Sequence, residues 1–396
     1  MTSVNKRRAL LGSYCPSFFN IQVNSCKDIY ASSLFNSSVL FHEYIHYMQD
    51  MTTTAGYERL WNLLMKVNYL CLELQGKSDV AVPYAIKSEA WKQNDKEEKA
   101  VDCHDDYRWT EYKIADIVEE EDKRVVLKIE AEDGLHDVPF GTYQVEEIMA
   151  ECCESTHPLY TPSSEYPYTL WEKFNDFFHC NLTKQDFSKL SLVSLIHPCP
   201  GIVFYDILGG LKYFKLDEML ELTFKRNLKH KRMFRDFALA SMKWLYGGDF
   251  PGVFKWFYNS MLFNDRYDDF ETFIKLLDEP MLCPKSEFFN FFIHNGFPIV
   301  RDKHGNYGYG AEFEGEEDLY GLVALMSCMD MLFDKSSFGC PFQKMCDDYR
   351  EEKKEQRLSI DCAGTPWNYQ NGDKLCIFSK MWKSLGFPSE VKRAES

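Results

Sequence analysis

The stretch Val-Leu-Phe-His-Glu-Tyr-Ile-His-Tyr-Met-Gln-Asp-Met, residues 39–51, contains the pattern His-Glu-x-x-His at His42, Glu43 and His46. On a helix, residues four apart lie on one face, so the two imidazole rings would point the same way. Such a pair suits a zinc ion. Glu43 would lie beside the metal and could take a proton from a water molecule whose pKa the metal lowers to about 7. Five residues therefore predict two metal ligands and a general base.

The residues around this pattern are uncharged up to Asp50. Buried neighbours of this kind would exclude water and hold metal ligands in one rotamer. They are Val39, Leu40, Phe41, Tyr44, Ile45, Tyr47 and Met48. The stretch resembles the active-site helix of the zincin metallopeptidases, and this resemblance implies a catalytic zinc site. The metzincin extension is absent, because Gln49 and Thr52 stand where Gly and His would be needed. The alternative is a surface helix with two unrelated histidines.

A second helix is expected to end near Glu154, with Thr142 as a candidate N-cap. In this helix Glu147 and Glu151 are four apart and would share a face. The segment Glu147-Ile-Met-Ala-Glu151 resembles the second active-site helix of the gluzincins, a group of zincins. That resemblance implies that Glu147 is the third zinc ligand. It also implies that Glu151 accepts a hydrogen bond from a ligating histidine, for which His42 is the first choice.

The third ligand has alternatives in the same region. These are Glu146, Glu154 and His157, and a solvated acidic helix face would explain the repeated glutamates without any metal. About a hundred residues separate His46 from Glu147, which is longer than usual for gluzincins. A polar insertion and several strands would have to fill that interval.

The composition predicts a globular protein and restricts its partners. Of the 396 residues, 45% are hydrophobic and 16% aromatic, which argues against disorder. The net charge of −16 and the lack of a large basic patch argue against nucleic acid and anionic membranes as partners. No apolar run has the length of a signal sequence or a membrane span. Fourteen cysteines without a signal sequence indicate reduced thiols and a cytoplasmic location.

The pattern of elements predicts an α+β, mainly α fold. Residues 1–180 would form a zincin-like catalytic core, with a polar insertion and strands at about 76–140. Those strands would make a small antiparallel sheet beside the motif helix, and the zincin resemblance implies that an edge strand binds the substrate backbone. Residues 181–396 would be a mainly helical C-terminal half. A turn-rich segment at 296–310 is a candidate subdomain joint.

Two further groups of residues are candidates for chemistry. Tyr166 and Tyr168 lie in a segment rich in tyrosine and proline that could cover the cleft, where either could polarise a substrate carbonyl. Four cysteines near the C-terminus could hold a second, structural zinc, although no Cys-x-x-Cys pair occurs among them. They are Cys340, Cys346, Cys362 and Cys376, and burial in a core is the alternative explanation.

The sequence therefore predicts a zinc-dependent hydrolase, with peptide-bond hydrolysis implied by the resemblance to zincins. Zn²⁺ would be held by His42, His46 and Glu147, and the substrate would be a peptide or protein. The alternatives are a metal hydrolase that does not act on peptides, and a helical partner-binding protein whose His-Glu-x-x-His pattern is inert. Metal content separates the last alternative from the other two.

Overall fold

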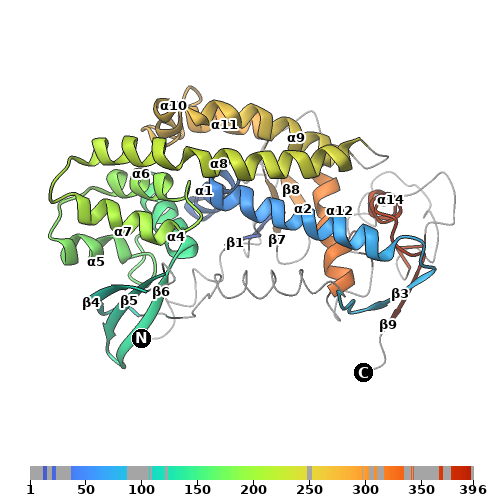
Figure 1. Ribbon diagram of the computed structural model, residues 1–396, viewed down its shortest axis with the longest axis horizontal. Helices are drawn as coiled ribbons and strands as arrows, with labels where there is room; N and C mark the ends of the chain where they lie inside the picture. The colour runs from blue at the N-terminus through green and yellow to red at the C-terminus, as the bar shows by residue number, and fades with distance from the viewer. Residues whose placement is uncertain are drawn as a thin grey trace.

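The computed structural model describes residues 12–15, 20–23, 37–86, 107, 109–120, 124–247, 252–296, 298–302, 307–309, 316–333, 340, 342, 365–368 and 376–393. This part of the chain is mainly helical and carries three small sheets (Figure 1). The predicted α+β, mainly α class is confirmed. Most of the predicted polar insertion, 87–106, and the charged segment 347–358 lie outside the described residues.

The two N-terminal helices, α1 (Ser38–Thr52) and α2 (Thr54–Leu74), are joined by a single residue, Thr53. The Ser37 hydroxyl accepts a hydrogen bond from the Leu40 amide and caps α1, as the position of a short polar residue before an apolar run predicts. Thr53 caps α2 in the same way, by accepting from the Gly56 amide. A Cβ at Gly56 would lie 2.1 Å from the carbonyl oxygen of Asp50, so only glycine lets α2 start this close to α1.

The predicted antiparallel sheet is present and leads directly into the second acidic helix. It consists of β4 (Tyr112–Glu119), β5 (Val125–Ala131) and β6 (Gly134–Phe140), in that spatial order. Leu127 is fully buried at the centre of the sheet, opposite Ile117 on one side and Val138 on the other. Gly141 separates β6 from α4 (Thr142–Glu154), so the sheet fixes where α4 begins.

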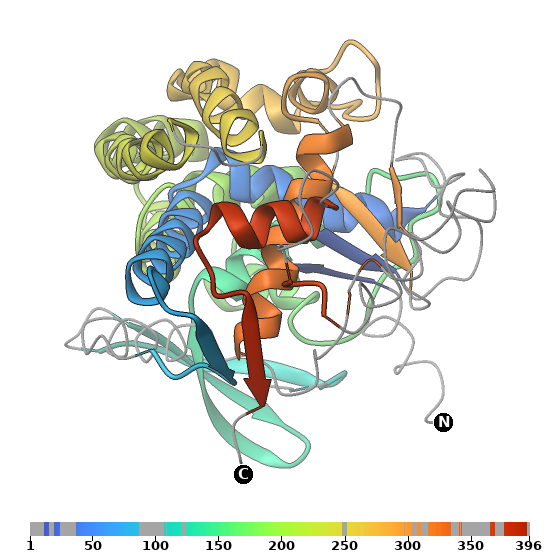
Figure 2. The ribbon, with the colours of Figure 1, turned by 90° about the vertical axis from the view of Figure 1, so that its right-hand side faces the viewer.

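Two other sheets join segments from opposite ends of the sequence. A four-stranded sheet has the order β1 (Gly12–Cys15), β2 (Asn20–Val23), β7 (Ile299–Asp302), β8 (Tyr307–Tyr309), and β2 pairs with β7 in parallel. In Figure 2, β3 (Asp79–Val82) lies beside β9 (Glu390–Arg393), with which it pairs in parallel. The turn-rich segment at 296–310 therefore contributes two strands to a sheet with the N-terminal strands.

Nine further helices complete the described part of the chain. They are α5 (Leu170–Phe178), α6 (Lys184–Ser194), α7 (Pro200–Gly210), α8 (Leu216–Tyr246), α9 (Val253–Phe263), α10 (Phe270–Ile274), α11 (Glu287–Asn295), α12 (Glu316–Phe333) and α14 (Ile377–Ser384). The 31-residue α8 is one helix that packs along α2, where the sequence predicts two helices, 216–228 and 232–246. The helix predicted at 251–276 is instead broken by two 3-10 turns, η2 (Asn264–Asp268) and η3 (Lys275–Leu277).

Helix α1 lies in the core, and much of its packing comes from the C-terminal half of the chain. The ring of Phe41 packs edge-on against Phe288 of α11, and Tyr44 packs in the same way against Phe292. The hydroxyl of Tyr47 donates to the carbonyl oxygen of Asn295 over 2.8 Å. The motif helix is therefore held by residues almost 250 positions further along the chain.

Candidate metal centre

The His-Glu-x-x-His pattern lies on α1, and α4 packs beside it. The imidazole rings of His42 and His46 are 4.9 Å apart at 74° to each other, as expected for residues one helical turn apart. Nε2 of His42 lies 3.3 Å from one carboxylate oxygen of Glu147, and Nε2 of His46 lies 3.6 Å from the other. The three predicted ligands therefore meet at one point between α1 and α4.

The geometry of this group fits a tetrahedral metal ion. Ligand atoms bound at about 2.1 Å in a tetrahedron are about 3.4 Å apart, which is close to the separations between Glu147 and the two histidines. One ligand atom from each of His42, His46 and Glu147 lies within 4.8 Å of the others. Two imidazoles and one carboxylate form a donor set that zinc accepts, with a fourth position for water or substrate. These residues could hold a metal ion, and the donor set does not by itself identify which one.

A hydrogen bond to Glu154 orients the other nitrogen of His42. Nδ1 of His42 lies 3.1 Å from the carboxylate of Glu154, which follows Glu147 by seven residues, or two turns of α4. The sequence assigned this role to Glu151, which lies with His42 and Glu154 in a second group that could hold a metal ion. The carboxylate of Glu151 instead accepts a hydrogen bond from the hydroxyl of Tyr160. It also lies 4.0 Å from Nζ of Lys184, a cation that would disfavour metal binding by Glu151.

His46 is oriented by a residue that the sequence did not indicate. Its Nδ1 lies 2.8 Å from the side-chain oxygen of Gln49, one turn further along α1. The amide nitrogen of Gln49 in turn donates to the backbone carbonyl of Glu146 on α4 over 3.0 Å. Gln49 therefore connects His46 to α4, the helix that carries Glu147. In the sequence, the only indication of this contact is that Gln49 follows His46 by three residues.

An ion-pair network joins the same two helices behind the ligands. The guanidinium group of Arg59, on α2, donates to Asp50 over 2.5 Å and to Glu146 over 2.6 Å. Asp50 also accepts from the hydroxyl of Tyr14 on β1 over 2.7 Å, and the ring of Tyr14 stacks on His46 at 6.2 Å. The carboxylate of Glu146 thus pairs with Arg59, and Glu146 is not part of the His42, His46 and Glu147 group.

The other two alternatives for the third ligand also lie elsewhere. Glu154 lies on the Nδ1 side of His42, away from Glu147. His157 accepts a hydrogen bond from the amide of Leu159 through Nδ1, and its ring packs against Phe41. Glu147 is the acidic residue that faces Nε2 of both histidines.

Burial sets the protonation of the group. Burial lowers the pKa of His46, which keeps its ring neutral and able to bind a metal. Burial also lowers the pKa of His42, but hydrogen bonds to Glu147 and Glu154 outweigh it, and the pKa is raised. For Glu43, burial raises the pKa to about 8, the positive charge on His42 lowers it, and the nearby carboxylates Glu147 and Glu154 raise it.

Besides burial, an excess of buried carboxylates affects these pKa values, and it raises those of His42 and Glu43. Glu43, Glu147 and Glu154 are each less than 10% exposed, and they interact with one another electrostatically. Buried carboxylates are stable when paired with a cation or bound to a metal. A divalent cation among them would compensate the charge and lower the pKa of Glu43. The electrostatics of the group therefore fit a bound metal ion.

One of the two candidate tyrosines contacts the ligands. The ring of Tyr168 lies 6.0 Å from that of His42, at 69°. Tyr166 is fully buried against Trp109 and Tyr112, an aromatic cluster beside β4.

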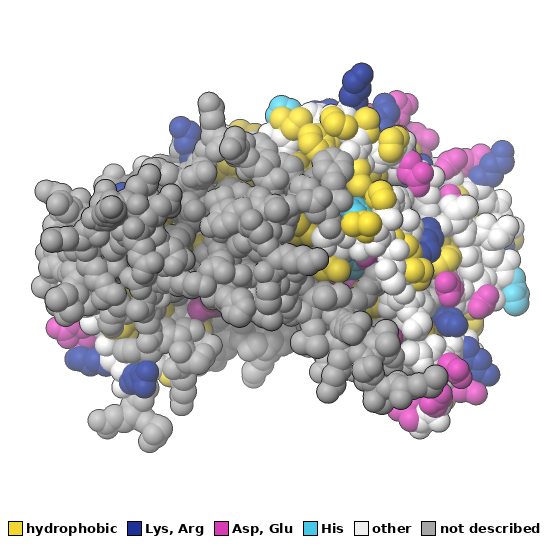
Figure 3. Space-filling view, turned by 180° about the vertical axis from the view of Figure 1, so that it is seen from behind, with side chains coloured by type: hydrophobic (Ala, Val, Ile, Leu, Met, Phe, Trp, Pro, Cys, Tyr) yellow, Lys and Arg dark blue, Asp and Glu magenta, His cyan; other side chains and the backbone are white. Residues whose placement is uncertain are grey.

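Seen from behind, the molecule shows hydrophobic side chains near the middle of one face, with some histidine and acidic side chains among them (Figure 3).

The cysteines give no second metal group in the described part of the chain. Cys340 and Cys376 are described and are free thiols, whereas Cys346 and Cys362 lie outside the described residues. The sulfur of Cys376 accepts a hydrogen bond from the Ser379 amide and caps α14. No disulfide joins any two of the ten described cysteines, and none of them belongs to a group of possible metal ligands in that part of the chain.

Among the helices that the structure describes, none combines the length and the apolar composition needed to cross a membrane. The comparisons with known proteins found no matching family model, no matching curated protein and no matching solved structure.

Proposed function

We propose that the chain is a Zn²⁺-dependent hydrolase that acts on peptides or proteins in the cytoplasm. The observation that carries this proposal is the convergence of His42, His46 and Glu147, with Glu43 buried next to them. The location rests on the number of cysteines in the sequence and on the ten free thiols.

Each side chain of the candidate site has a separate role in the proposed hydrolysis. Zinc, when bound, supplies a Lewis acid that polarises a carbonyl and acidifies water. His42 and His46 present Nε2 to it because Glu154 and Gln49 hold their Nδ1 atoms. Glu43 takes the proton of the attacking water and delivers it to the leaving amine. We expect Tyr168, which contacts His42, to donate a hydrogen bond to the substrate carbonyl.

Peptides are the proposed substrates for two reasons. The first is the resemblance of the α1 and α4 sequences to zincin helices. The second is the position of β1, which packs against α1 and carries Tyr14 onto His46. Among the described strands, β1 pairs with β2 alone, so its other edge would be open to an extended peptide. The same ligands fit other hydrolyses, so a metal hydrolase with another substrate is the second candidate.

Metal analysis and one substitution test the proposal. We expect purified protein to contain close to one zinc per chain by mass spectrometry. Glu43→Gln should keep that zinc and the fold, but hydrolysis of a peptide library should fall by about 10²–10⁴-fold, the contribution of general-base catalysis. Glu218→Gln is the matched control, because Glu218 is an exposed residue in the first turn of α8.

Three results would contradict different parts of the proposal. If carefully prepared protein contains no metal, the remaining alternative is a helical partner-binding protein whose His-Glu-x-x-His pattern is inert. Full activity of Glu43→Gln would reject Glu43 as the base, and loss of zinc from this variant would make Glu43 a ligand. Metal-dependent hydrolysis of esters or small amides, without cleavage of any peptide in the library, would favour the second candidate.

A further inference from the structure

Helix α8 exposes a row of large apolar side chains to solvent. Leu222, Met233, Phe237 and Trp244 are 66%, 40%, 43% and 55% exposed, although their helix packs along α2 and the ring of Phe237 lies 5.4 Å from that of Trp61 on α2. Single exposed apolar residues are ordinary, but a row on one helix is characteristic of binding surfaces. This surface, from Leu222 to Trp244 on α8, is called the α8 seam below.

The seam has the spacing of a helix that pairs with another helix. Its residues occur at intervals of three and four: Leu222, Arg226, Lys229, Met233, Phe237, Ala240 and Trp244, all of them exposed. Intervals of this kind align side chains along one side of a helix, as in the contact faces of coiled coils. The row covers about 33 Å at 1.5 Å per residue, which is the length of a partner helix of about 20 residues.

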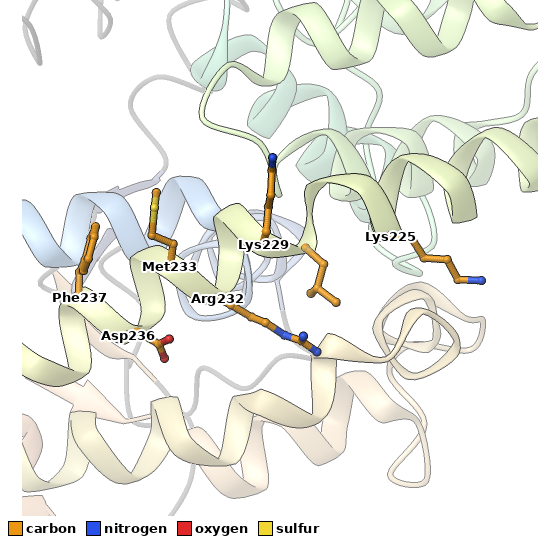
Figure 4. A pocket seen from close by; sticks show the side chains of 7 residues that line it. Lys225, Lys229, Arg232, Met233, Asp236 and Phe237 are labelled. Carbon is orange, nitrogen blue, oxygen red and sulfur yellow. The ribbon is translucent and has the colours of Figure 1, made fainter.

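A shallow groove lies in the middle of the seam. It has a volume of about 550 Å³, and the residues that line it include Lys225, Lys229, Arg232, Met233, Asp236 and Phe237. In Figure 4 the side chains of Lys229, Met233 and Phe237 stand on one side of α8, whereas those of Arg232 and Asp236 lie on the other. Such a groove can receive the side chains of a partner helix.

The charge of the seam is opposite to that of the whole protein. Residues 222–235 contain six lysines and arginines and no acidic residue, in a chain whose net charge is −16. Two of the six, Lys231 and Arg235, are buried and pair with Asp268 below the helix. Four are exposed, namely Lys225, Arg226, Lys229 and Arg232; of these, Lys225 pairs with Glu221 and Arg232 with Asp268. In the part of the chain that the structure describes, no carboxylate pairs with Lys229 or Arg226 within 4.0 Å.

The mixture of charged and apolar residues on one face favours a protein partner over a membrane. A helix that lies on a bilayer separates its apolar face from its charged face. Here Arg226 and Lys229 stand in the same row as Met233 and Phe237, and Asp236 lines the groove. The acidic surface of the rest of the chain would also be repelled by anionic lipid.

We propose that the α8 seam docks an amphipathic, acidic helix of a partner protein. The apolar side chains of that helix pack between Leu222, Met233, Phe237 and Trp244, and its carboxylates meet the exposed lysines and arginines. Charge complementarity decides the occupant, because an acidic partner is attracted to this seam and repelled by most of the remaining surface.

A designed peptide tests the chemistry directly. The probe is a fluorescently labelled helix of about 21 residues, with leucine at the a and d positions and glutamate at e and g of each heptad. We expect fluorescence anisotropy to show saturable binding that weakens with salt, and a peptide with lysine in place of each glutamate should not bind. Lys229→Glu should weaken binding by about tenfold or more, because it places a like charge opposite the probe.

Matched variants distinguish binding at the seam from general effects of charge and hydrophobicity on binding. Lys113→Glu makes the same change of net charge on the exposed face of β4 and should leave binding within about twofold. Met233→Ser should weaken binding by about tenfold, whereas Leu135→Ser, at an exposed position on β6, should not change it. Circular dichroism should show that all four variants are folded.

Several outcomes would overturn the proposal. Failure of the acidic peptide to bind, or binding that neither Lys229→Glu nor Met233→Ser weakens, would show that the seam is not its site. Binding to phosphatidylserine vesicles that is lost in both variants would assign the seam to a membrane. A dimer seen by light scattering that both variants dissociate would assign it to a second copy of the chain.

Discussion

Replacement of Glu154 by glutamine is the most direct test of how the metal centre is built. The glutamine has the same shape and keeps an oxygen that can accept a hydrogen bond, but it removes the negative charge 3.1 Å from Nδ1 of His42. The carboxylate makes the opposite ring nitrogen, Nε2, a stronger ligand and fixes the tautomer of the ring. We therefore expect Glu154→Gln to bind zinc more weakly while the protein remains folded.

The expected size of the effect follows from that single contact. Loss of a hydrogen-bonded group that orients a ligating histidine typically lowers metal affinity by about 10–100-fold. This corresponds to about 1.4–2.8 kcal/mol, since each factor of ten is about 1.4 kcal/mol. Glu151→Gln is the matched control, because Glu151 is on the same helix but bonds to Tyr160. Its zinc affinity should change by less than about threefold.

A competition titration measures both affinities. Each protein is stripped of metal and titrated with zinc in the presence of a chromophoric chelator, and thermal melts without metal check that each variant is folded. The reasoning would be refuted if Glu151→Gln lost affinity and Glu154→Gln did not. That result would restore the assignment made from the sequence, in which Glu151 orients His42.

Two further predictions concern the stability of the scaffold. Asp268→Asn leaves the fully buried Lys231 without its carboxylate and should reduce the free energy of unfolding by about 3–5 kcal/mol, measured by urea denaturation at pH 7. Burial raises the pKa of Asp268, but Lys231 and neighbouring arginines outweigh it and lower that pKa. The carboxylate of Asp268 therefore stabilises the wild-type protein above its pKa in the unfolded chain, which is about 3.9. This stabilisation is lost as the pH falls through the lower pKa that Asp268 has in the folded protein. Melting temperatures below pH 4 should accordingly fall more steeply for the wild type than for Asp268→Asn, and parallel curves would contradict this. Gly56→Ala should destabilise the protein by about 3 kcal/mol, because its Cβ would overlap the backbone of Asp50, and an unchanged melting temperature would show that α2 shifts freely.

The motif helix was predictable from the sequence because its signals are local. A polar cap, an apolar run and two histidines four apart lie within fifteen residues, and the structure places them on α1. Glu147 was predictable only through the resemblance of α4 to a known helix. The choice between Glu151 and Glu154 could not be made, because both share the face of Glu147 and their partners depend on the angle at which α4 crosses α1.

Other features depend on segments that are far apart in the chain. Arg59 meets Glu146 across 87 residues, and no periodicity in the sequence links them. The pairing of β2 with β7 could not be inferred from strands of four residues each. The net charge of −16 for the whole chain also gave no indication of the basic residues on the α8 seam. These residues can be recognised as one surface only when α8 is known to be a single helix with an exposed face.

The packing of α1 has a consequence for synthesis of the chain. The hydroxyl of Tyr47 bonds to Asn295, 248 residues later, and the aromatic rings that enclose α1 come from the same late helix. A ribosome that adds about 5–20 residues per second needs about 12–50 s to produce that helix after α1. During this interval α2 and α4 have emerged, but the side of α1 that packs against Phe288 and Phe292 is not yet covered. Nascent chains shorter than about 295 residues should therefore leave this side of α1 exposed and should depend on chaperones.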